Sequence, residues 1–258
     1  METYFGQSLT GLDREWETTV LRFRTSRGVP ATARARLVVG ADGASSLVRR
    51  LAFPSRPAAA RYVAVQGVFE KAGGEPYYGA IFDETLTDFY GWTIPKGDSV
   101  LVGAAFPGGT RGEAAGSMRE RFDEFVSRAR SAGFSFGAER CRHSAWLARP
   151  TRPWQLLPGD DAVALLGEAA GFLSPSSGEG ISSAMRSGVA LARAASAGLE
   201  GAGAKYRAAT RPIRLEVTAR IAKSAAIYSP ATRRILMRTG LDVIERQTYR
   251  PLPGLAID

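Results

Sequence analysis

Two segments of this chain, far apart in the sequence, follow the same pattern: a short apolar run ends in glycine and an acidic residue, and a helix start follows. The first is LVVGADGASSLVRR over residues 37–50, and the second is AVALLGEAAGFLSPSSGEGISSAMRSG over residues 162–188. Short continuous apolar runs are typical of buried parallel strands, and Ser45 or Ser46 can cap the first helix. The pattern therefore predicts two strand–turn–helix units of an α/β protein.

The residues between these two units predict a different architecture. Short links rich in Gly, Pro, Asp and Lys join strand-like stretches at 62–69, 77–82, 88–94 and 99–106. This spacing predicts an antiparallel meander, which a helix over 113–132 and a strand over 140–147 would complete. We therefore expect a nucleotide-binding domain at 1–53 and 158–200, interrupted by an antiparallel substrate domain at 54–157.

The C-terminal segment, residues 201–258, is predicted to be helical and basic. Helical patterns cover 205–228 and 230–246, with a break at Ser229-Pro230. Residues 205–258 contain eleven of the 34 basic residues but only four of the 25 acidic residues. Such asymmetry favours an anionic partner, such as a membrane surface or an acidic substrate, although a solvated helix face explains it equally well. Aromatic residues are not regularly interleaved with the basic ones, so we expect no nucleic-acid partner.

Composition argues against several other classes. No apolar run reaches the roughly 18 residues of a membrane span, and the N-terminus METYFGQSLTGLDREWE has neither the basic nor the apolar region of a signal peptide. The single cysteine, Cys141, and the single histidine, His143, leave no disulfide framework and too few ligands for a zinc site. We therefore expect no metal, a packing role for both side chains, and a cytoplasmic protein.

The two glycine–acid loops also suggest a ligand. Gly40 and Gly43 would let a ligand approach the backbone, the helix start favours phosphate, and the Asp42 carboxylate suits ribose hydroxyls or a water-bridged pyrophosphate. In the second segment, Pro175 to Gly180 precede a helix start where free backbone N–H groups converge. The alternative interpretations are an ordinary strand-to-helix turn and a glycine-rich surface loop.

Three motifs in order resemble those of a known family. The two loops resemble the aspartate-glycine and glycine-aspartate fingerprints of flavoproteins with the p-hydroxybenzoate hydroxylase fold. GEAAGFLSPSSGEGISSAMRSG at 167–188 and DFYGWTIPKG at 88–97 are similar to the geranylgeranyl reductase branch, in particular its CbrA-like group of FAD-dependent oxidoreductases, over residues 32–240. The resemblance implies an α/β fold, in which a Rossmann-like FAD/NAD(P)-binding domain carries an inserted antiparallel-sheet substrate domain and C-terminal helices.

The resemblance also implies FAD as the cofactor and assigns its contacts. Asp42 would contact the FAD pyrophosphate region, and Glu168 would hold the ribitol or ribose. Residues 175–181 would lie against the isoalloxazine, and Tyr90 and Trp92, on one face of a strand, would line a cavity for a long apolar substrate, although core packing explains these aromatics equally well. The implied contacts are Gly40, Asp42, Gly43, Gly167, Glu168, Ala169, Gly171, Pro175, Gly178, Glu179, Gly180 and Ile181 for FAD, and Tyr90, Trp92 and Pro95 for substrate.

One signature of the family is not in this sequence. Such proteins begin with a strand and a GxGxxG loop, followed about 20 residues later by an acidic ribose ligand. The nearest glycine spacing here, Gly198, Gly201 and Gly203, follows a predicted helix. We therefore expect the chain to match the C-terminal majority of a longer flavoprotein, as a natural short form or a fragment, and its affinity for FAD stays open.

The predicted function is an FAD-dependent oxidoreductase that reduces a lipid-like or isoprenoid substrate with hydride from flavin N5. The electron donor would be NAD(P)H or a protein, and the sequence assigns no catalytic side chain. The basic helices would approach the anionic inner face of a membrane. Two alternatives stay open: a flavin monooxygenase on the same fold, and a non-redox protein that binds lipid or membrane.

Overall fold

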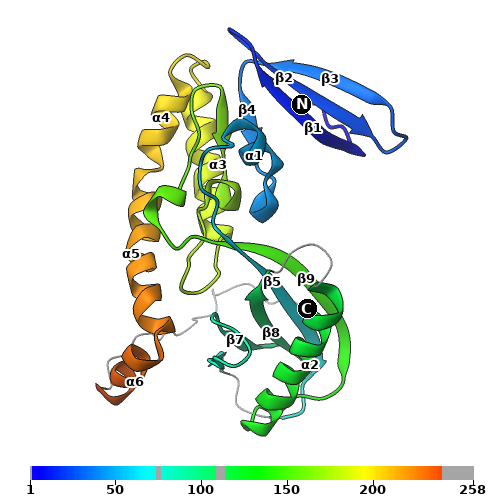
Figure 1. Cartoon of the computed structure of the whole chain (residues 1–258), viewed down its shortest axis with the longest axis vertical. Coiled ribbons are helices and arrows are strands. Elements are labelled where there is room, and N and C mark those ends of the chain that lie inside the picture. Colours follow the sequence, from blue (N-terminus) through cyan, green and yellow to red (C-terminus); the bar gives the residue numbers. More distant parts are fainter. Residues whose placement is uncertain (1, 74–76, 109–113, 240–258) are drawn as a thin grey trace, which may run out of the picture.

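The structure is a computed structural model that describes residues 2–73, 77–108 and 114–239 (Figure 1). The strands within these residues form three sheets. The first sheet is antiparallel and consists of β1 (Gln7–Arg14), β2 (Thr19–Thr25) and β3 (Pro30–Ala35). Its Leu12 and Leu21 belong to the same buried cluster as Val38, so this sheet packs against the second one.

The second sheet is a parallel pair of short strands. β4 (Val38–Gly40) pairs with β10 (Val163–Leu165), which places the two glycine–acid segments side by side and confirms the predicted parallel arrangement. All three residues of β10 are fully buried, as apolar runs of parallel strands usually are. The helical elements around this pair are η1 (Gly43–Ser45), α1 (Leu47–Ala52), η2 (Pro153–Gln155), η3 (Gly167–Ala170), α3 (Ile181–Ala195) and α4 (Ala202–Ala209).

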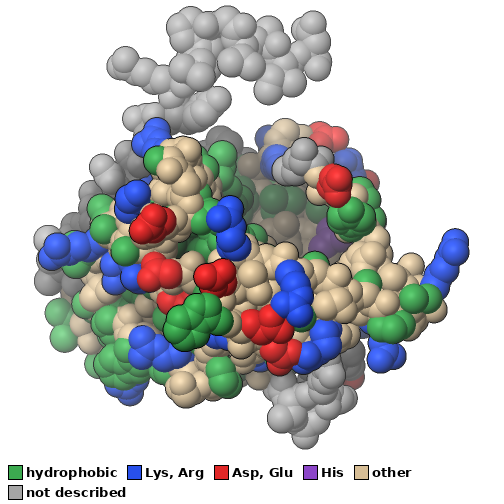
Figure 2. All heavy atoms as spheres, turned by 90° about the horizontal axis from the view of Figure 1, so that it is seen from above, with side chains coloured by type: hydrophobic (Ala, Val, Ile, Leu, Met, Phe, Trp, Pro, Cys, Tyr) green, Lys and Arg blue, Asp and Glu red, His purple; other side chains and the backbone are tan. Residues whose placement is uncertain are grey.

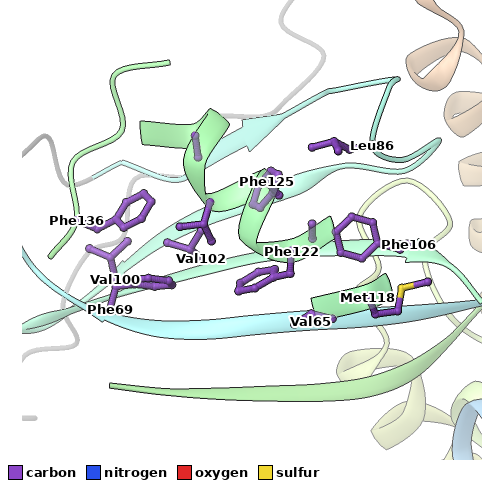
Figure 3. Packing of buried hydrophobic residues seen from close by; sticks show 13 residues of the cluster. Val65, Phe69, Leu86, Val100, Val102, Phe106, Met118, Phe122, Phe125 and Phe136 are labelled. Carbon is purple, nitrogen blue, oxygen red and sulfur yellow. The ribbon is translucent and has the colours of Figure 1, made fainter. Parts of the chain in front are cut away.

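The third sheet is antiparallel and has the strand order β6-β7-β8-β5-β9. Its strands are β5 (Ala60–Glu70), β6 (Gly79–Ile81), β7 (Gly91–Lys96), β8 (Ser99–Pro107) and β9 (Glu139–Arg149). α2 (Ala114–Ser131) covers one face, where Phe122 and Phe125 lie in one core with Val102 and Phe106 (Figure 3). The predicted antiparallel sheet and its helix are therefore confirmed, but the meander order holds for β6, β7 and β8 and is wrong for β5, which pairs with β8 and β9.

Aromatic side chains cover the opposite face of this sheet near α5 (Arg211–Tyr228). Tyr62 of β5 and the two residues before β7, Phe89 and Tyr90, are buried together, and Tyr228 at the end of α5 packs on them. The rings of Phe89 and Tyr228 stack with their centroids 5.2 Å apart. α5, orange in Figure 1, thus extends from the parallel pair and α4 to the antiparallel sheet.

The C-terminal helices differ in part from the prediction. The helix predicted over 205–228 is divided into α4 and α5, because Thr210 ends the first helix and Pro212 lies in the first turn of the second, where its missing N–H is tolerated. α6 (Pro230–Thr239) follows, and the predicted extension to Arg246 lies outside the described residues.

β2 lies in the stretch ETTVLRFRT at 17–25, whose alternation of apolar and polar residues predicts a strand, but β1 and β3 were not predicted from the sequence. β3, with the sequence PATARA, carries no large apolar side chain, and β1 is mostly exposed, so neither has the alternation that marks a half-buried strand. Over the described ranges, no helix combines the length and apolar character needed to cross a bilayer.

Candidate functional site

The two glycine–acid loops leave the parallel strands at the same edge. Gly40 is paired with Leu165, and the Leu166 amide donates a hydrogen bond to the Gly40 carbonyl at 2.9 Å. A Cβ added at Gly40 would lie 2.7 Å from Leu165 Cδ2 and 2.9 Å from Val48 Cβ. Close packing of the two strands and α1 therefore explains this glycine without a ligand.

Asp42 is the acidic residue of the first loop, and its carboxylate caps α1. Its Oδ1 accepts from Ser46 Oγ at 2.6 Å, and its Oδ2 accepts from the amides of Leu47 and Val48 at 2.6 and 3.1 Å. Gly43 has a φ of +69°, and no described atom beyond its sequence neighbours lies within 4 Å of a Cβ added there. The carboxylate thus has a local structural role, while the backbone at Gly43 is open.

Glu168 is the acidic residue of the second loop, and it bonds to a different sheet. Its Oε1 accepts a hydrogen bond from the amide of Ala148, near the end of β9, at 2.6 Å. Burial raises the pKa of Glu168, and the hydrogen bond from Ala148 opposes this effect. The half-buried carboxylate therefore connects the parallel pair to the antiparallel sheet.

Small residues of the second loop permit close packing around it. Gly167 has a φ of +52°, and a Cβ added there would lie 2.8 Å from Ala184 Cβ of α3. Gly171 has a φ of +79°, and its added Cβ would lie 2.9 Å from the Gln155 carbonyl oxygen. Ala169 is 1% exposed. The turn and its packing thus require small residues here, whatever ligand the loop binds.

Arg49 of α1 connects the two loops, although no sequence pattern singles it out. Its buried guanidinium donates to the carbonyls of Ala169 at 3.0 Å, Gln155 at 2.7 Å and Pro57 at 3.0 Å. Desolvation lowers the pKa of Arg49. The adjacent Arg50 is exposed, so only packing shows which of the two arginines holds the loops together.

Three consecutive carbonyls of the second loop are each held by a side chain from a different segment. We call Tyr90, Arg149 and Tyr228 the anchoring triad; they come from the residue before β7, the end of β9 and the end of α5. The hydrogen bonds are Arg149 Nε to Pro175 O at 3.1 Å, Tyr228 Oη to Ser176 O at 2.8 Å, and Tyr90 Oη to Ser177 O at 2.7 Å. The loop is therefore held at its carbonyl groups.

The amide groups of the same loop are largely free. Those of Ser176, Ser177, Glu179 and Gly180 donate no hydrogen bond within the described part of the chain, whereas that of Gly178 donates to Ser174 O. α3 begins at the next residue, and the first turn of a helix also has unpaired amides and a partial positive charge. A set of backbone donors suited to negative charge or carbonyl oxygens thus lies at this turn.

Both loops contact the same end of β9. Arg61, which is paired with Ala148 of β9, donates to Ser45 Oγ beside the first loop at 3.2 Å. In the second loop, a Cβ added at Gly178 would lie 3.3 Å from Leu147 Cδ1 of β9. The two loops therefore lie at one end of the antiparallel sheet, as a single ligand-binding region requires.

Comparison with known proteins gives the chain curated relatives. No family model matches it. Protein CbrA from Escherichia coli O6:H1 is 37% identical over 210 residues, which are 80% of this chain and 54% of CbrA. The chain thus spans about half the length of the curated relatives it matches.

Solved structures identify the fold. A geranylgeranyl bacteriochlorophyll reductase-like protein from Thermoplasma acidophilum matches with a TM-score of 0.66 and 17% identity, over 92% of this chain and 69% of that one. A Klebsiella pneumoniae HpxO variant complexed with FAD matches with a TM-score of 0.54 and 18% identity, over 92% of this chain and 63% of that one. The chain has the fold of FAD-binding flavoproteins.

On this flavoprotein fold, the predicted cofactor residues divide into accessible and buried groups. Glu179 is exposed and the Ile181 side chain is 77% exposed, whereas Pro175 is buried and its carbonyl is used by Arg149. The free amides at this turn suit the pyrimidine edge of an isoalloxazine ring, which has carbonyl oxygens and gains negative charge on reduction. The residues of the second loop therefore fit a flavin ring.

The predicted substrate residues do not all share one surface. Tyr90 and Trp92 lie together, with ring centroids 5.7 Å apart, and the Trp92 indole donates to Gln66 Oε1 at 3.0 Å. Pro95 lies on the opposite face of β7, because side chains alternate along a strand, and it borders a separate cavity of about 250 Å³ with Phe134. The structure thus separates Pro95 from the two aromatic residues.

A cavity of about 700 Å³ lies along β9 and is bordered by none of the predicted FAD or substrate residues. Its borders include Val63, Met118 and the neighbouring residues Cys141 and His143. Both of the last two side chains are exposed, so the expectation that they pack in the core is wrong. Their strand lies at the edge of the sheet, and both side chains project from the face opposite α2, because His143 pairs with Gln66 beside Trp92.

Proposed function

We propose that this chain belongs to an FAD-dependent oxidoreductase that reduces a carbon–carbon double bond in a lipid-like or isoprenoid substrate. When bound, FAD would supply hydride from N5, and solvent would supply the proton. The first loop, with Gly43 open, would lie at the pyrophosphate region, and Glu168 would hold the ribitol or ribose. Residues 176–181 would lie against the isoalloxazine ring.

The observation that carries this proposal is the arrangement of the second loop. Its carbonyls at 175–177 are bonded to the anchoring triad, whereas its amides at 176, 177, 179 and 180 have no partner in the described residues. Donors held in place before a ligand arrives stabilise developing negative charge without further reorganisation. The chain would thereby bind and orient the ring and favour its reduced, anionic form.

An apolar substrate is supported by the sheet face beside this loop. Trp92 is half-buried there and lies beside Tyr90, Gln66 and Ala64 on the face opposite α2. The Thermoplasma protein with the same fold is described as geranylgeranyl bacteriochlorophyll reductase-like, which favours a reductase acting on an isoprenoid group. We infer that Tyr90 and Trp92 border the substrate, whereas Pro95 lies on the other face of β7.

Peripheral contact with an anionic membrane is a second part of the proposal. Arg211, Arg234 and Arg238 are exposed on α5 and α6 and can face anionic headgroups. Arg220 and Arg233 of the same helices pair with Glu216 and Glu84, and Figure 2 shows acidic side chains among the basic ones on the face it displays. The attraction should therefore be weak, and more sedimentation with anionic than with neutral vesicles at low salt would support it.

The proposal is tested by adding FAD to the purified chain and following the quenching of flavin fluorescence. We expect saturable binding of one FAD per chain, followed by anaerobic reduction of a polyisoprenoid double bond when dithionite supplies electrons. A chain that binds no FAD but binds lipid vesicles would contradict the proposal and favour a non-redox lipid-binding protein. Oxygen-dependent hydroxylation without anaerobic reduction would indicate a monooxygenase.

A further inference from the structure

Arg149, the last residue of β9, is a buried cation whose direct partners are neutral. Its side chain is 6% exposed. It donates to Pro175 O at 3.1 Å, to Tyr62 Oη at 3.2 Å and to Ser224 Oγ at 2.8 Å. In the described part of the chain, no carboxylate lies within ion-pair distance of it. Buried charges are usually paired, because an unpaired one loses its hydration without compensation.

Aromatic rings replace part of the lost hydration. The guanidinium carbon lies 4.3 Å from the Tyr228 ring centroid, 4.8 Å from that of Phe89 and 5.7 Å from that of Tyr62. A cation over such rings is attracted to their negative faces. The Asp88 carboxylate is connected to the guanidinium through the Tyr62 hydroxyl, which accepts from Arg149 and donates to Asp88 Oδ2 at 3.0 Å. The positive charge therefore stays uncompensated at short range.

The position of this charge relates it to the candidate flavin site. Arg149 holds the carbonyl of Pro175 on one side of the loop, and the free amides begin at the next residue, Ser176. In a buried environment a charge acts over a longer distance than in water, because the effective dielectric constant is lower. The charge of Arg149 and the positive end of α3 would thus act on a bound ring in the same direction.

We propose that Arg149 is a positioning residue that orders the amides of residues 176–180 and, by its charge, raises the reduction potential of flavin bound there. The inference rests on the proposed function, because it concerns the same loop and the same ring. A purely structural arginine would order the loop without changing the relative affinity for oxidised and reduced FAD. Arg149→Met removes both the charge and the donors, whereas Arg149→Lys keeps the charge, so the two variants together separate these roles.

The first measurement is the midpoint potential of FAD bound to Arg149→Met. We expect binding of reduced FAD to weaken at least tenfold more than binding of oxidised FAD, which lowers the potential by about 30 mV for a two-electron couple. Arg149→Lys keeps the charge and should recover most of this shift. A potential equal to that of wild type in Arg149→Met, or an equal fall in Arg149→Lys, would overturn the electrostatic role.

The second measurement needs no flavin and uses hydrogen exchange, in the FAD-free protein, of the two loop amides that are hydrogen-bonded, those of Ser174 and Gly178, which donate to Glu179 O and Ser174 O. We expect faster exchange in Arg149→Met and in Tyr228→Phe, which removes only the neighbouring hydrogen bond to Ser176 O. Arg142→Met is the matched control, because it removes an arginine of the same strand that is paired with Glu139 and Asp123. Unchanged exchange in Arg149→Met would overturn the positioning role.

The two measurements keep this inference separate from the proposed function. If wild type binds no FAD, the proposed function fails, and the exchange experiment still tests whether Arg149 orders the loop. If Arg149→Met does not fold, Arg149→Gln replaces it as the neutral variant and must show the same fall in potential. Normal potential and normal exchange in that variant would contradict both parts of the inference.

Discussion

The two glycine–acid loops begin from the same sequence pattern but are stabilised in different ways. In the first, Asp42 bonds to residues four to six positions further along the chain and so completes its own helix. In the second, Glu168 bonds to β9 of another sheet, and the anchoring triad holds the following residues from three separate segments. A shared local pattern therefore produces one loop with a local role and one whose shape depends on the whole fold.

The largest difference between the loops should appear when one methyl group is added to each. Both glycines have a positive φ, which strains an alanine. The new Cβ of Gly167→Ala would also lie 2.8 Å from Ala184 Cβ, whereas the new Cβ of Gly43→Ala would lie in open space. We expect the free energy of unfolding to fall by about 2–4 kcal/mol for Gly167→Ala and about 1–2 kcal/mol for Gly43→Ala. Urea unfolding of both variants measures this, and equal losses would show that packing at the second loop is not tighter.

The next effect concerns ligand binding and compares two glycines with similar backbone strain. Gly178 lies in the second loop with a φ of +70°, and Gly28 lies in the turn between β2 and β3 with a φ of +80°. We expect Gly178→Val to weaken FAD binding at least tenfold, about 1.4 kcal/mol, and Gly28→Val to leave it unchanged. Fluorescence titration with FAD measures both, and wild-type affinity in Gly178→Val would place the flavin elsewhere.

A smaller effect should follow from removing one hydroxyl of the anchoring triad. Tyr90→Phe leaves the Ser177 carbonyl without its donor, which we expect to lower the free energy of unfolding by about 1 kcal/mol and to weaken FAD binding a few-fold. Tyr4→Phe is the control, because Tyr4 is exposed and its hydroxyl donates to the nearby Glu2. If both variants matched wild type in unfolding and titration, the loop would not depend on this anchor.

The smallest effect should be a change in the pH dependence of stability. Because burial raises the pKa of Glu168, the folded state binds its proton more tightly than the unfolded state, so stability falls as the pH rises from the ordinary value of 4.5 through the raised pKa. Glu168→Gln keeps an acceptor for the Ala148 amide but cannot ionise, so its stability should lack this fall. Unfolding curves across this pH range compare the two proteins, and parallel profiles would contradict the inferred burial effect.

Much of the fold could be predicted because its signals are local. The apolar runs at 37–39 and 162–166 are short and end in glycine, and both became strands of the parallel pair. The alternating stretches from 62 to 106 likewise became antiparallel strands. β3 was missed because its sequence has no apolar alternation, and it is a strand only through its pairing with β2.

The candidate site was predictable at its loops but not at the residues that hold them. The glycines and acids of both loops stand in continuous motifs, and these segments meet as expected from the parallel pairing. Arg49 and Arg149 are each one of 34 basic residues, and no motif marks either as buried. Their partners lie up to 120 residues away along the chain, so local patterning cannot show them.

Local sequence patterns are enough to locate the strands, helices and glycine turns of the two loops, because hydrophobic periodicity and glycine conformation act over a few residues. The side chains that hold the carbonyls at 175–177 are brought there by the packing of distant segments. Tyr90, Arg149 and Tyr228 are separated from their bonded partners by 87, 26 and 52 residues. Contacts over such distances depend on how sheets and helices pack, which local sequence patterns do not encode.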